Sequence, residues 1–149
     1  LPRANKPGLH VAFCSNSFAA YRVTALIAGG GFPLSATHGE DMIVAAKCLI
    51  CGGRVAYTAN ATVYHSHNYT IAQDFHRYYD TGTFHRQNLW LLERFGRAEG
   101  RGFKFLASEL RYVSRSAPWR IPEVFIRTVT RYVGYRVGFS KHPWLNFFF

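Results

Sequence analysis

Glu40 and Asp41 are adjacent carboxylates whose residue types suit proton-transfer chemistry. They lie in "THGEDM", residues 37–42, in a chain of 149 residues that has only eight acidic residues and a formal net charge of +10. Two explanations are open from local rules. Carboxylates are common in the first turn of a helix, where they interact favourably with the helix dipole. A carboxylate where a loop enters a helix can also face a cleft and act as a general base.

His65 and His67, in "YHSHNY", form the second candidate site. Residues two apart on a strand point to the same face, so both imidazoles are able to ligate one metal ion, or one ligates while the other packs. Two histidines alone are a weak metal signal, because a divalent site normally has carboxylates or cysteines as well. Cys48 and Cys51 have no second cysteine pair to complete a zinc site, and their apolar surroundings favour burial as small hydrophobic residues.

The elements that position these residues are predicted from hydrophobic periodicity. Met42, Ala45, Ala46 and Leu49 have helical spacing, so we expect a helix from Glu40 to Cys51 that ends at Gly52 and Gly53. We expect strands at residues 9–14, 54–57 and 61–65. The first part of the chain therefore predicts an α/β fold in which the acid pair begins a helix and the histidines lie at the end of a strand.

From residue 70 onward the pattern is helical. Thr70 is a suitable cap for a long helix to about Phe95, with a break expected at Gly82. Further helices are expected over residues 103–113 and from the Pro118–Pro122 segment to about Val137. We therefore divide the chain into two domains, residues 1–69 and residues 70–149.

The second domain is strongly basic. From residue 71 the sequence has thirteen Lys/Arg against six Asp/Glu, a net charge of +7. Four arginines alternate with aromatic residues: Arg120, Arg127, Arg131 and Arg136 with Phe125, Tyr132, Tyr135 and Phe139. This pattern fits either a solvated face over a core stripe or a cationic helix that lies on an anionic membrane surface. Nucleic acid is the weaker alternative, because no nucleic-acid-binding motif is present.

The odd number of cysteines, three, fits a reducing compartment. The sequence shows no signal peptide and no apolar run long enough to span a bilayer. We therefore expect a cytoplasmic protein that is peripheral at the inner face of the cell membrane.

The order of four motifs is more specific than any one of them. "SNSFAAYR", "GGGFP", "GEDM" at the start of a helix and "GGRVAYTANATVYHSH" follow one another along the chain. This order resembles the carboxyl-terminal half of a family 2 inverting glycosyltransferase of the GT-A, Rossmann-like fold. It is most similar to the rhamnosyltransferase-like members that build bacterial surface polysaccharides. The resemblance implies an α/β fold for residues 1–69, the acceptor-side part of the catalytic domain, followed by a helical basic extension.

The resemblance also implies roles for the candidate residues. Asp41 would be the general base that deprotonates an acceptor hydroxyl, and Glu40 would orient the acceptor or the helix end. His65, with His67 second, would complete a site for a divalent metal, Mg or Mn. The donor would be a nucleotide sugar, with rhamnose as the sugar indicated. The acceptor would be a saccharide or a lipid-linked saccharide, and transfer would invert the anomeric centre.

The sequence departs from this family in lacking an Asp-x-Asp motif and a Gly-rich phosphate loop after a strand. We therefore expect a fragment or truncated relative that is incomplete and inactive as an isolated chain. Two alternatives stay open beside the enzyme. One is a non-catalytic module that binds membranes or nucleic acid through its basic segment, and the other is an inactive truncated relative.

Overall fold

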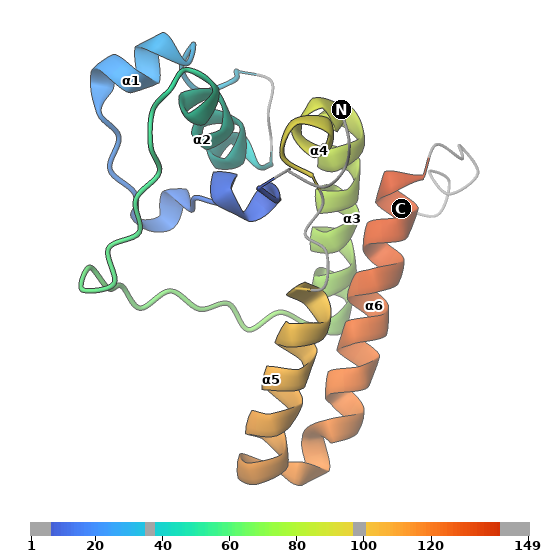
Figure 1. The fold of residues 1–149 in the computed structure, drawn as a ribbon. Helices are drawn as coiled ribbons and strands as arrows, with labels where there is room; N and C mark the ends of the chain where they lie inside the picture. Colours follow the sequence, from blue (N-terminus) through green and yellow to red (C-terminus); the bar gives the residue numbers. More distant parts are fainter. Residues whose placement is uncertain (1–6, 35–37, 97–100, 141–149) are drawn as a thin grey trace. The chain divides into compact units, whose positions relative to one another are not determined.

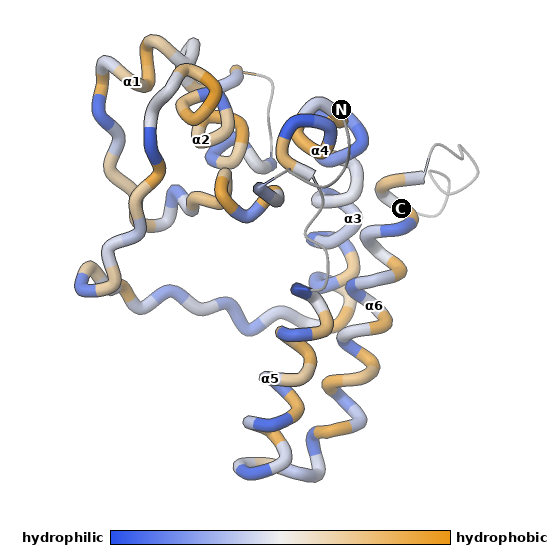
Figure 2. Tube along the Cα trace, viewed as in Figure 1, coloured by the Kyte–Doolittle hydropathy of each residue, from blue (hydrophilic) through white to orange (hydrophobic). Residues whose placement is uncertain are grey.

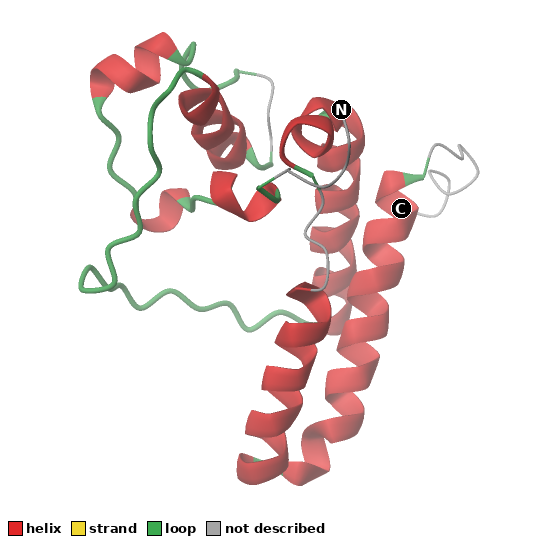
Figure 3. Ribbon diagram, viewed as in Figure 1, coloured by secondary structure: helices red, strands yellow, loops and turns green. Residues whose placement is uncertain are grey.

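The computed structural model describes residues 7–34, 38–96 and 101–140 of the chain. Over these residues the structure is helical and contains no strand, as Figures 1 and 3 show. The elements in chain order are η2 (Leu9–Ala12), η3 (Asn16–Phe18), α1 (Val23–Ala28), α2 (Glu40–Ile50), α3 (Ile71–Gln87), α4 (Leu89–Phe95), α5 (Arg101–Ser116), η4 (Pro118–Arg120) and α6 (Ile121–Phe139). The described residues up to His67, with the segment from Trp90, form one compact unit. The residues from Asn68 to Leu89 and those from 101 onward form the second.

The predicted α/β, Rossmann-like fold is wrong, because the described residues form only helices, turns and loops. The segment expected as a first strand contains the 3-10 turn η2 instead. Residues 54–57 and 61–65 have no strand partner within the described ranges, and Thr58–Ala61 close a turn between them. A strand exists only when its backbone N–H and C=O groups pair with a neighbour, and an alternating sequence does not specify that neighbour.

The first unit is built around α2. Val44 and Ala46 of α2 are buried, as are Leu9 and Ala12 of η2, which packs against this helix. The Gly8 amide donates to the carbonyl oxygen of Phe95 at 2.7 Å and so joins the start of η2 to the end of α4. The expected burial of the cysteine pair is not observed. Cys51 is exposed, and the Cys48 and Cys51 thiols donate to carbonyls of α1, Cys48 to Ala25 at 3.6 Å and Cys51 to Ala28 at 3.7 Å.

The helix predicted from Glu40 is confirmed as α2. It begins after Gly39, which has a φ of 72° and a left-handed conformation that favours glycine. Gly39 has no side chain with which to cap the helix. The first two residues of the helix, Glu40 and Asp41, both carry a carboxylate. The negative charges of both residues are favourable there because the amino end of a helix carries partial positive charge.

In the second unit, α3 and α6 lie side by side and run in the same direction (Figure 1). Thr70 caps α3 as expected and forms a capping box with Gln73. The break in the long helix falls at Asn88, between α3 and α4, and not at Gly82. Gly82 is buried inside α3, where a Cβ would meet the Phe139 amide of α6 at 2.8 Å. The glycine therefore serves close helix packing, and the expected break at that position is wrong.

Two glycines of α6 complete this close contact. A Cβ on Gly134 would lie 2.6 Å from the carbonyl oxygen of Phe75, and one on Gly138 would meet the carbonyl oxygen of Tyr79. Both glycines are buried. The two backbones approach each other only because these positions lack side chains.

A buried ion pair joins the same two helices. Asp74 of α3 is 3% exposed and accepts hydrogen bonds from Arg127 Nη1 at 2.7 Å and Arg131 Nη2 at 3.2 Å. Arg127 also donates to the backbone oxygen of Tyr69 at 3.0 Å. Two of the four arginines in the basic aromatic pattern are therefore used to hold α6 on α3.

Helix α5 leads through η4 into α6, and this connection forms a helical hairpin. Figure 2 shows hydrophobic residues recurring along both helices between hydrophilic ones, as expected for amphipathic helices. No helix within the described residues is long and apolar enough to cross a membrane.

Candidate functional site

The acid pair at the start of α2 is held by a residue from a distant turn. Asn16 Nδ2 donates to Glu40 Oε1 at 3.0 Å, and the Asn16 backbone N–H donates to Asp41 Oδ2 at 3.3 Å. The other carboxylate oxygen of Asp41, Oδ1, accepts from the Met42 amide at 2.7 Å. Asn16 thus contacts both predicted catalytic residues. Since a carboxylate offers about four acceptor positions, Asp41 retains capacity for a further hydrogen bond.

Asn16 is itself oriented by Tyr21, whose hydroxyl donates to Asn16 Oδ1 at 2.6 Å. Burial of the phenol raises the pKa of Tyr21 well above its usual range, and the neighbouring Cys14 and the Asp41 carboxylate raise it further. Tyr21 is therefore protonated at physiological pH and acts as a donor. A donor at Oδ1 directs the Asn16 Nδ2 hydrogens away from Tyr21, toward Glu40.

The predicted metal-ligating pair is joined to the same turn. His65 Nε2 lies 3.1 Å from Ser17 Oγ and 3.0 Å from His67 Nε2. The two imidazole rings meet edge to face with centroids 4.5 Å apart. The histidines are thus brought together, although they belong to an exposed loop and not to a strand.

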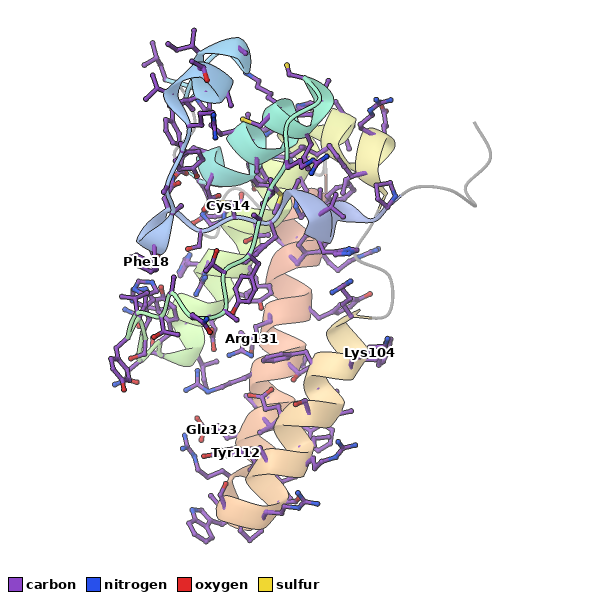
Figure 4. All side chains as sticks on the ribbon, turned by 60° about the vertical axis from the view of Figure 1, so that its left-hand side comes forward. Cys14, Phe18, Lys104, Tyr112, Glu123 and Arg131 are labelled. Carbon is purple, nitrogen blue, oxygen red and sulfur yellow. The ribbon has the colours of Figure 1, made fainter. Side chains whose placement is uncertain are left out.

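The turn at residues 15–17 connects the two candidate pairs through adjacent residues. Ser15 caps η3 by accepting from the Ser17 amide, which fixes the turn locally. Asn16 then reaches the acids and Ser17 reaches His65. Figure 4 labels Cys14 and Phe18, which flank this turn in the sequence.

A divalent metal finds only part of its ligand set here. Nowhere in the described ranges do three His, Cys, Asp or Glu side chains gather as a metal site would require. The two imidazole nitrogens converge and could supply two ligands to a divalent ion, while Mg²⁺ and Mn²⁺ both favour oxygen for the remaining ligands. The metal role of His65 and His67 stays a prediction.

Sequence reasoning assigned no role to Asn16, Ser17 and Tyr21. They lie in the "SNSFAAYR" motif, where the structure places Ser15 as the cap of η3. The signal for a further role was the gathering of polar side chains between two apolar segments. This signal did not identify Glu40 as the partner of Asn16, because the two residues are 24 positions apart in the sequence.

The proteins that the chain resembles in sequence transfer sugars, according to their names. The chain is similar to the O-antigen chain rhamnosyltransferase WbaN of Salmonella anatum, with 46% identity over 135 residues, 91% of this chain and 42% of the relative. It is also similar to the O-antigen chain rhamnosyltransferase RfbN of Salmonella typhimurium (strain LT2), with 44% identity over 137 residues, 92% of this chain and 43% of the relative. The resemblance to rhamnosyltransferases inferred from the motif order is therefore confirmed as a sequence similarity. The chain spans less than half the length of these relatives. No family model matches it, and no solved structure matches it.

Proposed function

We propose that the chain is the base-carrying part of a glycosyltransferase that transfers a sugar, rhamnose by analogy with its relatives, from a nucleotide-sugar donor to a saccharide acceptor. The observation that carries this proposal is the identity of about 45% with two rhamnosyltransferases over nine tenths of the chain. The transfer activity is assigned to the whole protein. The network around Asp41 supports the choice of the base within this part.

In this proposal the acceptor hydroxyl oxygen attacks the anomeric carbon of the donor sugar. The bond between that carbon and the diphosphate oxygen breaks, and the nucleoside diphosphate leaves with the electron pair. The hydroxyl proton passes to the Asp41 carboxylate, and attack from the face opposite the leaving group inverts the anomeric centre. A base must lie within hydrogen-bond reach of the proton that it takes. Asp41 suits this role because its two backbone hydrogen bonds fix the carboxylate and leave acceptor capacity.

Glu40 has a supporting role. Its Oε1 is held by Asn16, so its other carboxylate oxygen is positioned to accept a hydrogen bond from another hydroxyl of the acceptor sugar. If a divalent ion is bound by His65 and His67, it would neutralise charge on the leaving diphosphate. The acceptor is a saccharide or a lipid-linked saccharide, and a lipid-linked acceptor would place the reaction at the cytoplasmic face of the membrane.

Asp41→Asn in the whole protein tests the assignment of the base. We expect kcat to fall about a hundredfold or more, because the amide keeps the size of the side chain but accepts no proton. The matched control is Asp80→Asn, which makes the same change at an exposed position of α3. The measurement is the rate of sugar transfer to a saccharide acceptor, with far-ultraviolet circular dichroism as a check of folding.

The two parts of the proposal fail in different ways. A folded Asp41→Asn protein with near wild-type turnover would exclude Asp41 as the base but keep the transferase. No transfer by the wild-type protein from any nucleotide sugar, with hydrolysis also absent, would contradict the transferase itself.

A further inference from the structure

The face of α6 that points away from its glycines is apolar and exposed. Val129 is 60% exposed and Tyr132 63% exposed, and the other large members of this face are Phe125, Ile126 and Val133. Their spacing of three and four residues places them on one side of the helix. We call these five residues the outer face of α6. One side of α6 is buried by glycine packing, and the opposite side leaves five large apolar residues exposed. An exposed apolar surface of this kind is typical of an interaction site.

Aromatic and basic residues are also exposed at the connection between α5 and α6. Trp119 of η4 is 75% exposed, and Tyr112 lies near the end of α5, where Figure 4 shows it close to the level of Glu123. Arg111, Arg115 and Arg120 are exposed in the same part of the chain. Trp, Tyr and Arg combine an apolar body with a polar end, which suits the boundary between hydrocarbon and water.

The charge of this hairpin is predominantly positive. Residues 101–140 contain eight Lys/Arg and two Asp/Glu. One of the two acids, Glu123, is bound by Arg120 and Arg127, and these hydrogen bonds hold the pKa of its carboxyl below the usual range. Arg127 and Arg131 are held by Asp74 on the side of α3. The exposed positive charge outside these ion pairs therefore lies with Arg101, Lys104, Arg111, Arg115 and Arg136. Arg127 and Arg131 of the basic aromatic pattern do not contribute to it.

We propose that the outer face of α6, together with Trp119 of η4, docks on an anionic phospholipid surface. The apolar residues enter the boundary of the hydrocarbon, and the exposed arginines contact the headgroup phosphates. A lipid surface fits these observations better than a protein partner because it matches both features at once, an apolar stripe and exposed basic residues on the same hairpin with little uncompensated acid. No described helix can span the bilayer, so the helix lies in the plane of the interface.

The proposal is independent of the reaction at Asp41. Co-sedimentation of the 149-residue chain with vesicles tests it, using vesicles of phosphatidylethanolamine with phosphatidylglycerol against vesicles of phosphatidylcholine alone. We expect binding to the anionic vesicles, weaker binding to the neutral ones and a decrease with added salt. Val129→Glu should weaken binding to the anionic vesicles about tenfold, because it places an acid at the centre of the outer face.

The matched control is Ile27→Glu, which makes the equivalent change at a position of α1 that is 71% exposed. It should bind as the wild type does. Because Val129 and Ile27 are both exposed, both variants should fold, and circular dichroism checks this.

Four outcomes would overturn the proposal. The first is wild-type binding by Val129→Glu, and the second is equal binding to neutral and anionic vesicles. The third is salt-sensitive retention by DNA without vesicle binding, which assigns the charge to nucleic acid. The fourth is a dimer in lipid-free buffer that Val129→Glu converts to a monomer without changing vesicle binding, which assigns the outer face to a second copy.

Discussion

Asn16 is the residue on which the proposed active site depends most. It donates from its side chain to Glu40 and from its backbone to Asp41, and its amide is oriented by the Tyr21 hydroxyl. A carboxylate acts as an efficient base only when its geometry is fixed before the substrate arrives. The side chain of Asn16 positions Glu40 directly and stabilises the turn from which its backbone reaches Asp41. We therefore regard Asn16 and Tyr21 as positioning residues.

Tyr21→Phe tests this positioning, because it removes only the hydroxyl group. Without the hydroxyl, Asn16 Oδ1 loses its donor, and the Asn16 amide is no longer held with Nδ2 toward Glu40. We expect kcat to fall about fivefold, since one hydrogen bond contributes roughly 1 kcal/mol. The measurement is kcat and KM for transfer by the whole protein, with Tyr57→Phe, an exposed tyrosine, as the control.

A double variant separates positioning from a general loss of structure. If Tyr21 acts through the acid pair, Tyr21→Phe should cost little further activity in the Asp41→Asn background. A full and independent loss in that background would show that Tyr21 supports the fold rather than the acids.

At the scale of secondary structure, the helices could be predicted and the fold class could not. The helix at Glu40 and the cap at Thr70 depend on hydrogen bonds within a few residues, so the local sequence contains the information. The contact from Asn16 to Glu40 and the packing of Gly138 on Tyr79 join distant positions. Gly82 was misread as a helix break because its reason for being a glycine lies on α6, which periodicity within α3 does not reveal.

Gly138→Ala tests the close packing of α3 and α6. The new methyl group would collide with the carbonyl oxygen of Tyr79, which is backbone and has little freedom to move. We expect a loss of about 1–3 kcal/mol in the free energy of unfolding, measured by urea denaturation. Gly102→Ala is the control, because its Cβ would meet nothing within 4 Å and alanine favours helix by up to about 1 kcal/mol. Equal stabilities for both variants would contradict the close approach.

At the scale of the whole molecule, the divalent metal is the proposal that extends furthest beyond these residues. The described ranges supply the imidazoles of His65 and His67, and no third His, Cys, Asp or Glu side chain gathers with them there. A nucleotide sugar carries a diphosphate whose oxygens are good ligands for Mn²⁺. We therefore expect the 149-residue chain to bind Mn²⁺ weakly alone and more tightly when a nucleoside diphosphate is present, because the diphosphate adds ligands to the histidine pair.

Titration of Mn²⁺ followed by electron paramagnetic resonance measures this without any transfer assay. The wild-type chain with the diphosphate should bind Mn²⁺ more tightly than the free diphosphate does. His65→Ala should remove this difference. His10→Ala, at an exposed position of η2, should not change it. If His65→Ala binds Mn²⁺ as the wild type does, the histidine pair is no metal site, and its hydrogen bonds to Ser17 and between the two rings would then serve to hold the loop at residues 65–67 against the turn.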